Sequence, residues 1–157
     1  MEMKNQPVRL FSVHIKHLDR YRFSSQASED GKLHGAEVIS DEPDPVGDAS
    51  GPSTPALLGS AIGHCLSASL LETLKKSRIH VDNMEAEVTA HVRPNENGLP
   101  RIKKIEVRII PTVSGDTARS QRCEDVFQQY CTVCSSVKEG IPVNVEVDWH
   151  IADSTQP

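Results

Sequence analysis

Apolar and polar residues alternate along several stretches of the chain, and this period of two predicts half-buried β-strands. The clearest alternation covers residues 84–93 and 104–109. These stretches flank the turn residues Asn97 and Gly98, so they predict an antiparallel hairpin. Strands are also predicted in four further stretches with the same tendency: residues 8–15, 20–27, 32–39 and 143–150.

Residues 51–76 change to the helical period of three and four. Thr54 suits the N-cap and Pro55 the first helical position, and histidine apart, the stretch holds no charged residue before Glu72. Small residues form a second stripe at every fourth position: Gly59, Gly63 and Ser67. Because each mid-helix glycine costs about 1 kcal/mol relative to alanine, we expect close packing against this stripe.

A second helix is predicted at residues 116–133, where cysteines and aromatic residues recur at steps of three and four. The predicted order is therefore β-β-β-α-β-β-α-β. It indicates an α+β fold in which antiparallel sheets pack around two long central helices, within a single domain of residues 1–157. The first helix is apolar on more sides than one small sheet covers, so we expect an intertwined dimer.

Composition narrows the classes of partner. The net charge of −5 and the pI near 5.8 argue against a nucleic-acid partner, which would need a clustered basic face. We expect no apolar run to approach the length of a membrane span, about 18–20 residues. No signal-peptide core is evident. These features predict a cytoplasmic protein with no membrane partner.

Four cysteines in a reducing compartment suggest reactive thiols rather than a structural disulfide framework. Cys65 lies in the middle of the first predicted helix, whereas Cys131 and Cys134 form a CxxC on the second, two turns after Cys123. Two buried helices that each present a thiol suggest a dithiol–disulfide couple. One thiolate would attack an oxidant and become a sulfenic acid, and the other thiol would condense with it and release water.

The attacking thiolate needs a nearby cation or hydrogen bond, because burial raises the pKa of a thiol. The candidates are His64, adjacent in sequence to Cys65, and Arg20 or Arg22 on the second predicted strand. Simple packing of the cysteines in the core is the alternative for each of them.

A zinc site would combine the CxxC with Cys65 and His64, or with Cys123. It is disfavoured because this CxxC lies on an apolar helical stripe, whereas structural zinc ligands usually lie in turns. We therefore predict no metal and no cofactor, since phosphate-cradling and nucleophile-elbow motifs are also missing.

Two segments resemble the signature motifs of the OsmC/Ohr family, the osmotically inducible and organic-hydroperoxide-resistance proteins. They are residues 51–65, which end at Cys65, and residues 131–145, which begin at Cys131. The resemblance covers residues 21–149 approximately and implies an intertwined homodimer with active sites at the interface. It implies that Cys65 is the peroxidatic cysteine and Cys131 the resolving one, reducing organic hydroperoxides at the expense of a dithiol reductant. Cys134 stands where the family usually has another residue, so it is either a second resolving thiol or a bystander.

The sequence departs from the family's peroxidases at Pro55, where they have a glutamate that orients an activating arginine. Arg20 and Arg22 lie in the right part of the chain for that arginine, and His64 is a possible substitute. The chain thus resembles a divergent OsmC-like branch. The alternative function is a non-catalytic protein that binds a small apolar or acyl ligand at the dimer interface, under the loop of residues 40–52. A CxxC module for metal binding or disulfide exchange is a third possibility.

Overall fold

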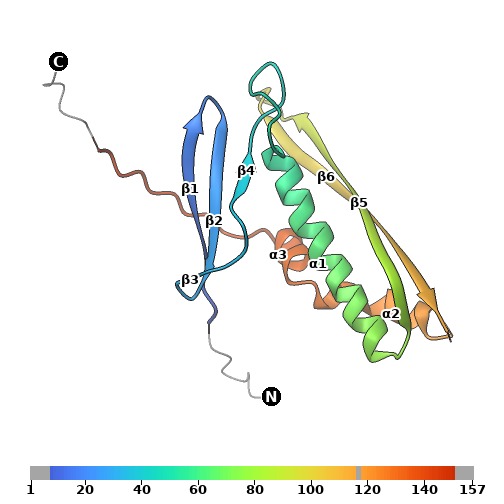
Figure 1. Cartoon of the computed structure of the whole chain (residues 1–157). Helices are drawn as coiled ribbons and strands as arrows, with labels where there is room; N and C mark the ends of the chain where they lie inside the picture. Colours follow the sequence, from blue (N-terminus) through green and yellow to red (C-terminus); the bar gives the residue numbers. More distant parts are fainter. Residues whose placement is uncertain (1–7, 116–117, 151–157) are drawn as a thin grey trace, which may run out of the picture.

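The computed structural model describes residues 8–115 and 118–150. A small sheet lies beside the start of a long helix, and a long β-hairpin covers the other side of that helix (Figure 1). The predicted α+β class with antiparallel sheets is confirmed. Four strands make the small sheet: β1 (Phe11–Asp19), β2 (Arg22–Glu29), β3 (Lys32–Leu33) and β4 (Val38–Ser40).

β2 is the central strand of this sheet, with β1 on one side and both β3 and β4 on the other. The register with β1 runs from the pair Phe11 and Glu29 to the pair Asp19 and Arg22. The single strand predicted at residues 32–39 is wrong, since it divides into β3 and β4. Gly35, at φ +71°, lies between the two short strands, and a left-handed residue there interrupts an extended chain.

The long helix is α1 (Thr54–Lys76). Its N-cap is Ser53, one residue before the predicted Thr54, and Pro55 lies in the first turn. With 23 residues, α1 is long and apolar enough to cross a membrane by length and composition, so the expectation that no run approaches a span is wrong. Core helices of soluble proteins in general satisfy the same test. In this structure α1 contributes residues to the apolar core.

The predicted hairpin is confirmed, and it is longer than expected at both ends. β5 (His80–Pro94) pairs with β6 (Pro100–Ser114) along their full lengths. The small-residue stripe of α1 packs on this hairpin: a Cβ at Gly63 would lie 2.6 Å from Cγ2 of Val88, and one at Gly59 would lie 3.3 Å from its Cγ1. The close packing expected at the stripe is thereby confirmed, and it occurs within one chain.

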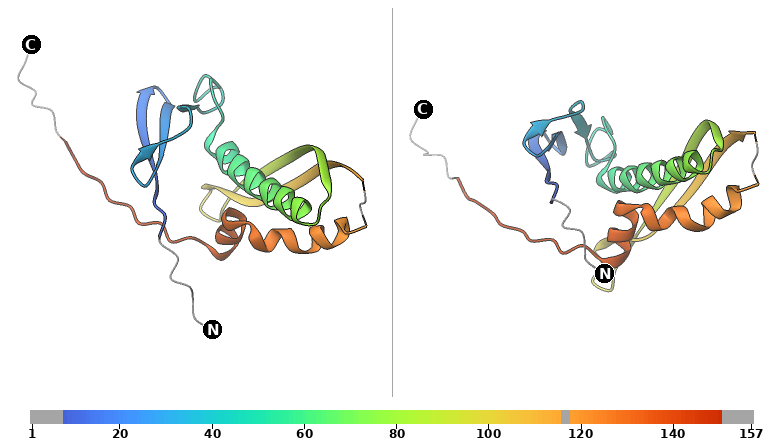
Figure 2. Two further views of the ribbon diagram at one scale, coloured as in Figure 1. Left: turned by 60° about the horizontal axis from the view of Figure 1, so that its bottom comes forward. Right: turned by 90° about the horizontal axis from the view of Figure 1, so that it is seen from below.

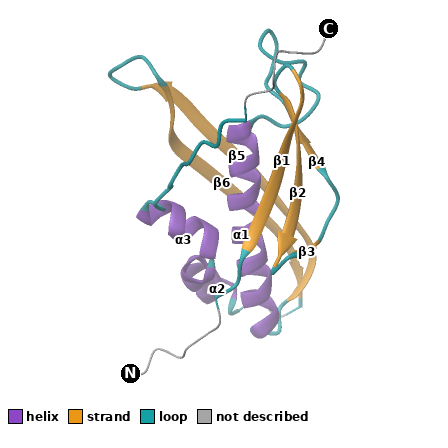
Figure 3. Ribbon diagram, turned by 90° about the vertical axis from the view of Figure 1, so that its left-hand side faces the viewer, coloured by secondary structure: helices purple, strands orange, loops and turns teal. Residues whose placement is uncertain are grey.

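The second long helix is not continuous. The chain forms α2 (Ser120–Val126), a 3-10 turn η1 (Phe127–Tyr130) and α3 (Thr132–Glu139), all beside α1 (Figure 3). Cys131 has an extended backbone, φ −84° and ψ 101°, which ends one helix and caps the next. Apolar residues recur across the break because both helices pack on α1, which is why the spacing suggested one helix. The predicted start at residues 116–117 lies outside the described residues.

The strand predicted at residues 143–150 is also wrong for the single chain. These residues have no regular secondary structure and extend away from the rest of the molecule (Figure 2). Their alternating apolar side chains are exposed, with Val145 at 82% and Trp149 at 84% of full exposure. A strand requires a hydrogen-bonding neighbour, and this segment lies beside none in its own chain.

The apolar core gathers around the face of α1 opposite to solvent. Its buried members are Ile62, Leu66, Leu70, Leu74, Ile79, Cys123, Phe127 and Cys131. The core therefore joins α1 directly to the segment that carries the CxxC.

Candidate functional site

Three of the four cysteines meet at this core. Cys65 on α1 and Cys134 on α3 are partly buried and pack against the same apolar cluster that contains Cys131. The sulfur of Cys131 accepts a hydrogen bond from the backbone N–H of Cys134 at 3.4 Å. The fold thus brings Cys65 together with the two cysteines of the CxxC, which lie 66 and 69 residues further along the chain.

The environment of Cys131 holds its thiol in the neutral form. Burial, a hydrogen bond with the thiol of Cys65 and the neighbouring Cys134 raise the pKa of Cys131 to about 11, against the opposing backbone N–H of Cys134. At neutral pH only about one Cys131 in ten thousand is therefore a thiolate.

The fourth cysteine belongs to a different environment. Cys123 is 1% exposed, and its sulfur contacts the hydroxyl of Ser77 at 3.1 Å and the carbonyl of Thr73 at 3.7 Å. These partners lie at the C-terminal end of α1, so the contacts of Cys123 join α2 to that end of the helix. Among the described residues, no group of three histidines, cysteines or acidic residues is arranged to hold a metal ion.

Two apolar cavities open beside Cys134. One of about 620 Å³ lies between α1, β6 and the α2–α3 segment, and one of about 360 Å³ lies between α1, β6 and α3. Both are lined by Cys134 and Lys138, together with Leu66, Ile105 and Val107. Aliphatic side chains of α1 and β6 form one part of each lining, and Lys138 contributes an ammonium to both. The larger cavity is also lined by Ser120, Glu124 and Gln128. This arrangement suits a ligand with an apolar part and a polar end.

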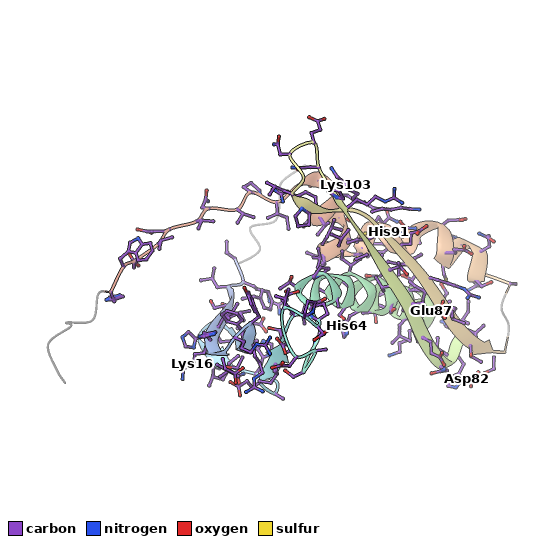
Figure 4. The ribbon with its side chains drawn as sticks, turned by 90° about the horizontal axis from the view of Figure 1, so that it is seen from above. Lys16, His64, Asp82, Glu87, His91 and Lys103 are labelled. Atoms are coloured by element: carbon purple, nitrogen blue, oxygen red, sulfur yellow. The ribbon has the colours of Figure 1, made fainter. Side chains whose placement is uncertain are left out.

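His64 lies on another side of α1 from these thiols. Adjacent helical residues point about 100° apart. His64 is exposed and lines a groove of about 430 Å³ with Gly63, Ser67 and residues of β5 such as Val88 (Figure 4). The structure therefore places His64 in this groove, whereas Cys65 contacts Cys131 at the start of α3.

Of the two candidate arginines, Arg22 begins β2, whereas Arg20 lies in the turn between β1 and β2 and not on the predicted strand. Arg22 forms an ion pair with Asp19 at 2.6 Å. Arg20 forms an ion pair with Asp48 and donates a hydrogen bond to the carbonyl of Val46 at 3.3 Å. Within the described residues, neither arginine forms a hydrogen bond or ion pair with a cysteine, because the sheet that carries them stands beside the start of α1 (Figure 2).

Asp41 organises the loop between β4 and α1. Its buried carboxylate accepts hydrogen bonds from the N–H groups of Glu42, Asp48 and Ser50 and from the Ser50 hydroxyl, at 2.8 to 3.1 Å. The Ser50 N–H above all, and then the other donors, lower the pKa of Asp41 against the effect of burial. Sequence reasoning missed this residue. Its signal was an aspartate at the start of a loop rich in proline and glycine, where such side chains bind backbone N–H groups.

The loop before α1 supplies a carboxylate to one of the candidate arginines. Residue 55 is a proline, and Asp48 is the carboxylate paired with Arg20. An arginine–carboxylate pair is thus present, and it is held in place by the hydrogen bond from Asp48 to Asp41.

Solved structures share this fold across most of the chain. An OsmC-like protein of unknown function from Vibrio cholerae has a TM-score of 0.64 at 16% identity, over 85% of this chain and 95% of that one. An OsmC-like protein from Mycoplasma pneumoniae gives 0.59 at 15% identity, over 87% and 89%. An organic hydroperoxide resistance protein from Elizabethkingia anophelis gives 0.55 at 16% identity, over 85% and 91%. At these identities the similarity concerns the fold.

The sequence itself provides the family assignment. No curated protein matches the chain significantly. The family model described as OsmC-like protein matches residues 47–146, which run from the loop before α1 to the segment after α3 and include Cys65, Cys131 and Cys134. Because this match spans more than half of the sequence, the chain belongs to the OsmC-like protein family.

Proposed function

We propose that this protein reduces organic hydroperoxides with a pair of cysteines, Cys65 attacking and Cys131 resolving. The observation that carries the proposal is the meeting of these thiols at one core cluster, from elements far apart in sequence. Relatives of the same fold include an organic hydroperoxide resistance protein, which supports a role in this chemistry.

The division of labour follows from the environment of Cys131. With a pKa of about 11, its thiol is a poor first nucleophile at neutral pH. In the proposed cycle, the Cys65 thiolate attacks the terminal oxygen of the hydroperoxide, the O–O bond breaks, and the alkoxide takes a proton and leaves as an alcohol. The resulting sulfenic acid of Cys65 is attacked by the sulfur of Cys131, and water leaves as the disulfide forms. A dithiol reductant then restores both thiols.

The aliphatic linings beside the cysteine cluster support organic hydroperoxides as the substrate class; Cys65 packs against the same apolar cluster but lines neither cavity. The leucine, isoleucine and valine side chains of these linings bury alkyl or acyl groups favourably, at about 25 cal/mol per Å² of apolar surface. Hydrogen peroxide has no such group to bury. We therefore expect the ratio of kcat to KM to rise with the size of the alkyl group.

Activation of Cys65 is proposed to require a homodimer. The Arg20–Asp48 pair and Arg22 lie on the small sheet, apart from the cysteines of the same chain. Intertwining of two copies would bring the arginines of one chain toward the thiols of the other. In that arrangement Asp48 would orient Arg20 as the family's glutamate does, and His64 would be a further candidate cation. The reduced cysteines of this cycle fit the cytoplasm, the compartment expected from the composition.

The test is hydroperoxide consumption by purified reduced protein with dithiothreitol as the dithiol. Cys65→Ser should lower turnover of cumene hydroperoxide at least about 100-fold, because the attacking thiolate is lost. Cys123→Ser is the matched control, since Cys123 is buried away from the cavities and should leave turnover within about twofold. Unchanged turnover in Cys65→Ser would exclude the proposed reaction.

The cavity of about 620 Å³ also favours a second function, the binding of an apolar or acyl ligand without catalysis. Native mass spectrometry distinguishes the two. A ligand retained by a protein that consumes no hydroperoxide would support the binding function, with Lys138→Glu weakening retention of an acidic ligand.

A further inference from the structure

The two cysteines of the CxxC share the first turn of α3. Cys131 is the N-cap residue and Cys134 is the third residue of the helix. The Cys131 side chain accepts the Cys134 N–H at 3.4 Å, as an N-cap side chain does when it folds over the first turn. Cys131 therefore has two thiol neighbours, Cys65 across the core and Cys134 on its own helix.

Access to these three sulfurs differs. Cys131 is only 1% exposed, whereas Cys65 and Cys134 are both partly exposed, and Cys134 lines both apolar cavities. Cys65 lines neither of these cavities. A disulfide between Cys65 and Cys131 would thus lie away from the cavities, with one sulfur in the core. A disulfide between Cys131 and Cys134 would have one sulfur at the cavity wall.

We propose that Cys134 takes over the disulfide after each oxidation and is the thiol through which the protein is reduced. The step is a thiol–disulfide exchange. The sulfur of Cys134 gives up its proton and attacks the sulfur of Cys131, the Cys131–Cys134 bond forms, the Cys65–Cys131 bond breaks, and Cys65 leaves as a thiolate that is protonated or reacts again. No electrons enter or leave the protein, so the step requires no further oxidant.

The exchange has two consequences for the cycle, and it rests on the proposed function. Cys65 becomes available for the next hydroperoxide before any reductant binds. The external dithiol then attacks the sulfur of Cys134 at the cavity wall, where neither Cys65 nor Cys131 lies. Cys134 is therefore a catalytic residue of the reducing half of the reaction, rather than a bystander beside Cys131.

Disulfide mapping tests the exchange directly, because trypsin puts Cys65 in a different peptide from the other three cysteines. Cys65 lies in the peptide of residues 33–75, whereas Cys123, Cys131 and Cys134 share the peptide of residues 123–138. Protein treated with one equivalent of cumene hydroperoxide is quenched in acid, alkylated with N-ethylmaleimide and digested without reduction. The native protein should end with a bond inside peptide 123–138, which fragmentation assigns to Cys131 and Cys134, and with Cys65 alkylated.

Cys134→Ser should instead accumulate the two peptides joined through Cys65 and Cys131. Its reduction by dithiothreitol should be at least about tenfold slower than that of the native protein. Cys123→Ser is the control and should behave as the native protein does. A final Cys65–Cys131 or Cys65–Cys134 bond in the native protein, with the remaining CxxC thiol alkylated, would overturn the exchange.

Oxidation with diamide separates this inference from the proposed function, since diamide couples thiols without hydroperoxide chemistry. A Cys131–Cys134 bond after diamide, in a protein that consumes no hydroperoxide, would refute the peroxidase and retain the preferred disulfide. Hydroperoxide consumption that ends on a Cys65–Cys131 bond would refute the exchange and retain the peroxidase. Circular dichroism of Cys134→Ser confirms that the variant is folded.

Discussion

At the scale of single residues, burial and not residue type distinguishes the thiols. Cys131 and Cys134 belong to one CxxC, yet only Cys131 lies fully in the core and has a pKa raised to about 11. In the proposed cycle, the burial that raises the pKa of Cys131 disfavours its attack on a hydroperoxide and also shields its sulfur from outside reagents. Its proposed role as resolving thiol needs only a partner at contact distance.

The raised pKa of Cys131 predicts a pH-dependent resolving step. Burial is the largest cause of the raised pKa and persists when Cys65 is oxidised, so disulfide formation from the Cys65 sulfenic acid should accelerate as pH rises from 7 and level off above the pKa of Cys131. Trapping of the sulfenic acid with dimedone measures its lifetime. In Cys131→Ser the lifetime should lose this dependence. A flat profile in the native protein would contradict the assignment of Cys131.

Asp41 predicts a loss of stability in acid. A carboxyl whose pKa is lowered on folding contributes stability above its ordinary value of 3.8, and that stability is lost as pH falls through the lower folded value. Asp41→Asn should therefore melt below the native protein at pH 7, and the gap in Tm should narrow by pH 3. Ser50→Ala, which removes only the hydroxyl donor, should give a smaller gap. An equal gap at both pH values would argue against this carboxylate as the cause.

At the scale of elements, the glycines of α1 are required by the approach of β5. A Cβ at Gly63 would lie 2.6 Å from Cγ2 of Val88, which is closer than side chains pack, and the β-branched valine has little freedom to turn away. A Cβ at Gly59 would meet the same valine at 3.3 Å. The close packing of α1 on the hairpin therefore depends on Gly63 more than on Gly59.

Gly63→Ala should lower the free energy of unfolding by about 1–2 kcal/mol, the overpacking exceeding the gain in helix propensity. Gly59→Ala should stay within about 0.5 kcal/mol of the native protein, since the two effects are similar there. Urea unfolding measures both. Addition of Val88→Ala to Gly63→Ala should cost less than the sum of the separate changes. Equal effects of the two alanines would mean that the contact with Val88 does not limit the packing.

At the scale of the whole molecule, two of the segments that the structure describes stand out for the apolar surface that a single chain leaves uncovered. One is the segment after α3, where Val145 and Trp149 are more than 80% exposed. The other is β1, an outer strand of the small sheet on which Val13 is 58% exposed. Exposed apolar residues in a strand-like pattern beside an unpaired strand edge indicate a partner surface. A second copy of the chain is the partner that we propose.

The native protein is accordingly expected to sediment at twice the chain mass of 17.3 kDa. Replacement of Val145 and Val147 by aspartate should shift the sedimenting mass toward that of one chain. The substitutions would place charges on the side of the segment that the proposed dimer buries. Replacement of Glu146 and Asp148 by lysine is the matched control on the alternate side. A native protein that sediments as one chain at micromolar concentration would contradict the dimer.

The long helix and the hairpin were predictable because the hydrophobic periodicity lies within each segment. Apolar residues recur at steps of three and four in α1, and they alternate with polar residues in β5 and β6 on either side of Asn97 and Gly98. The break at Cys131 was not predictable, since no proline or glycine marks it and the apolar spacing continues through it. The thiols Cys65, Cys131 and Cys134 could be named from the sequence as candidates. Their proximity could not be deduced from spacing, because it depends on how α3 packs on α1.

By itself the sequence determined the long helix, the long hairpin, the antiparallel α+β class and the cysteines of the candidate chemistry. Local spacing decides these features, since helix and strand expose their residues with different periods. Only the tertiary structure decided that Cys131 is a helix cap, that Cys134 faces the cavities, and that Asp48 rather than residue 55 supplies the carboxylate beside Arg20. These depend on contacts between segments far apart in the chain, which no local pattern encodes.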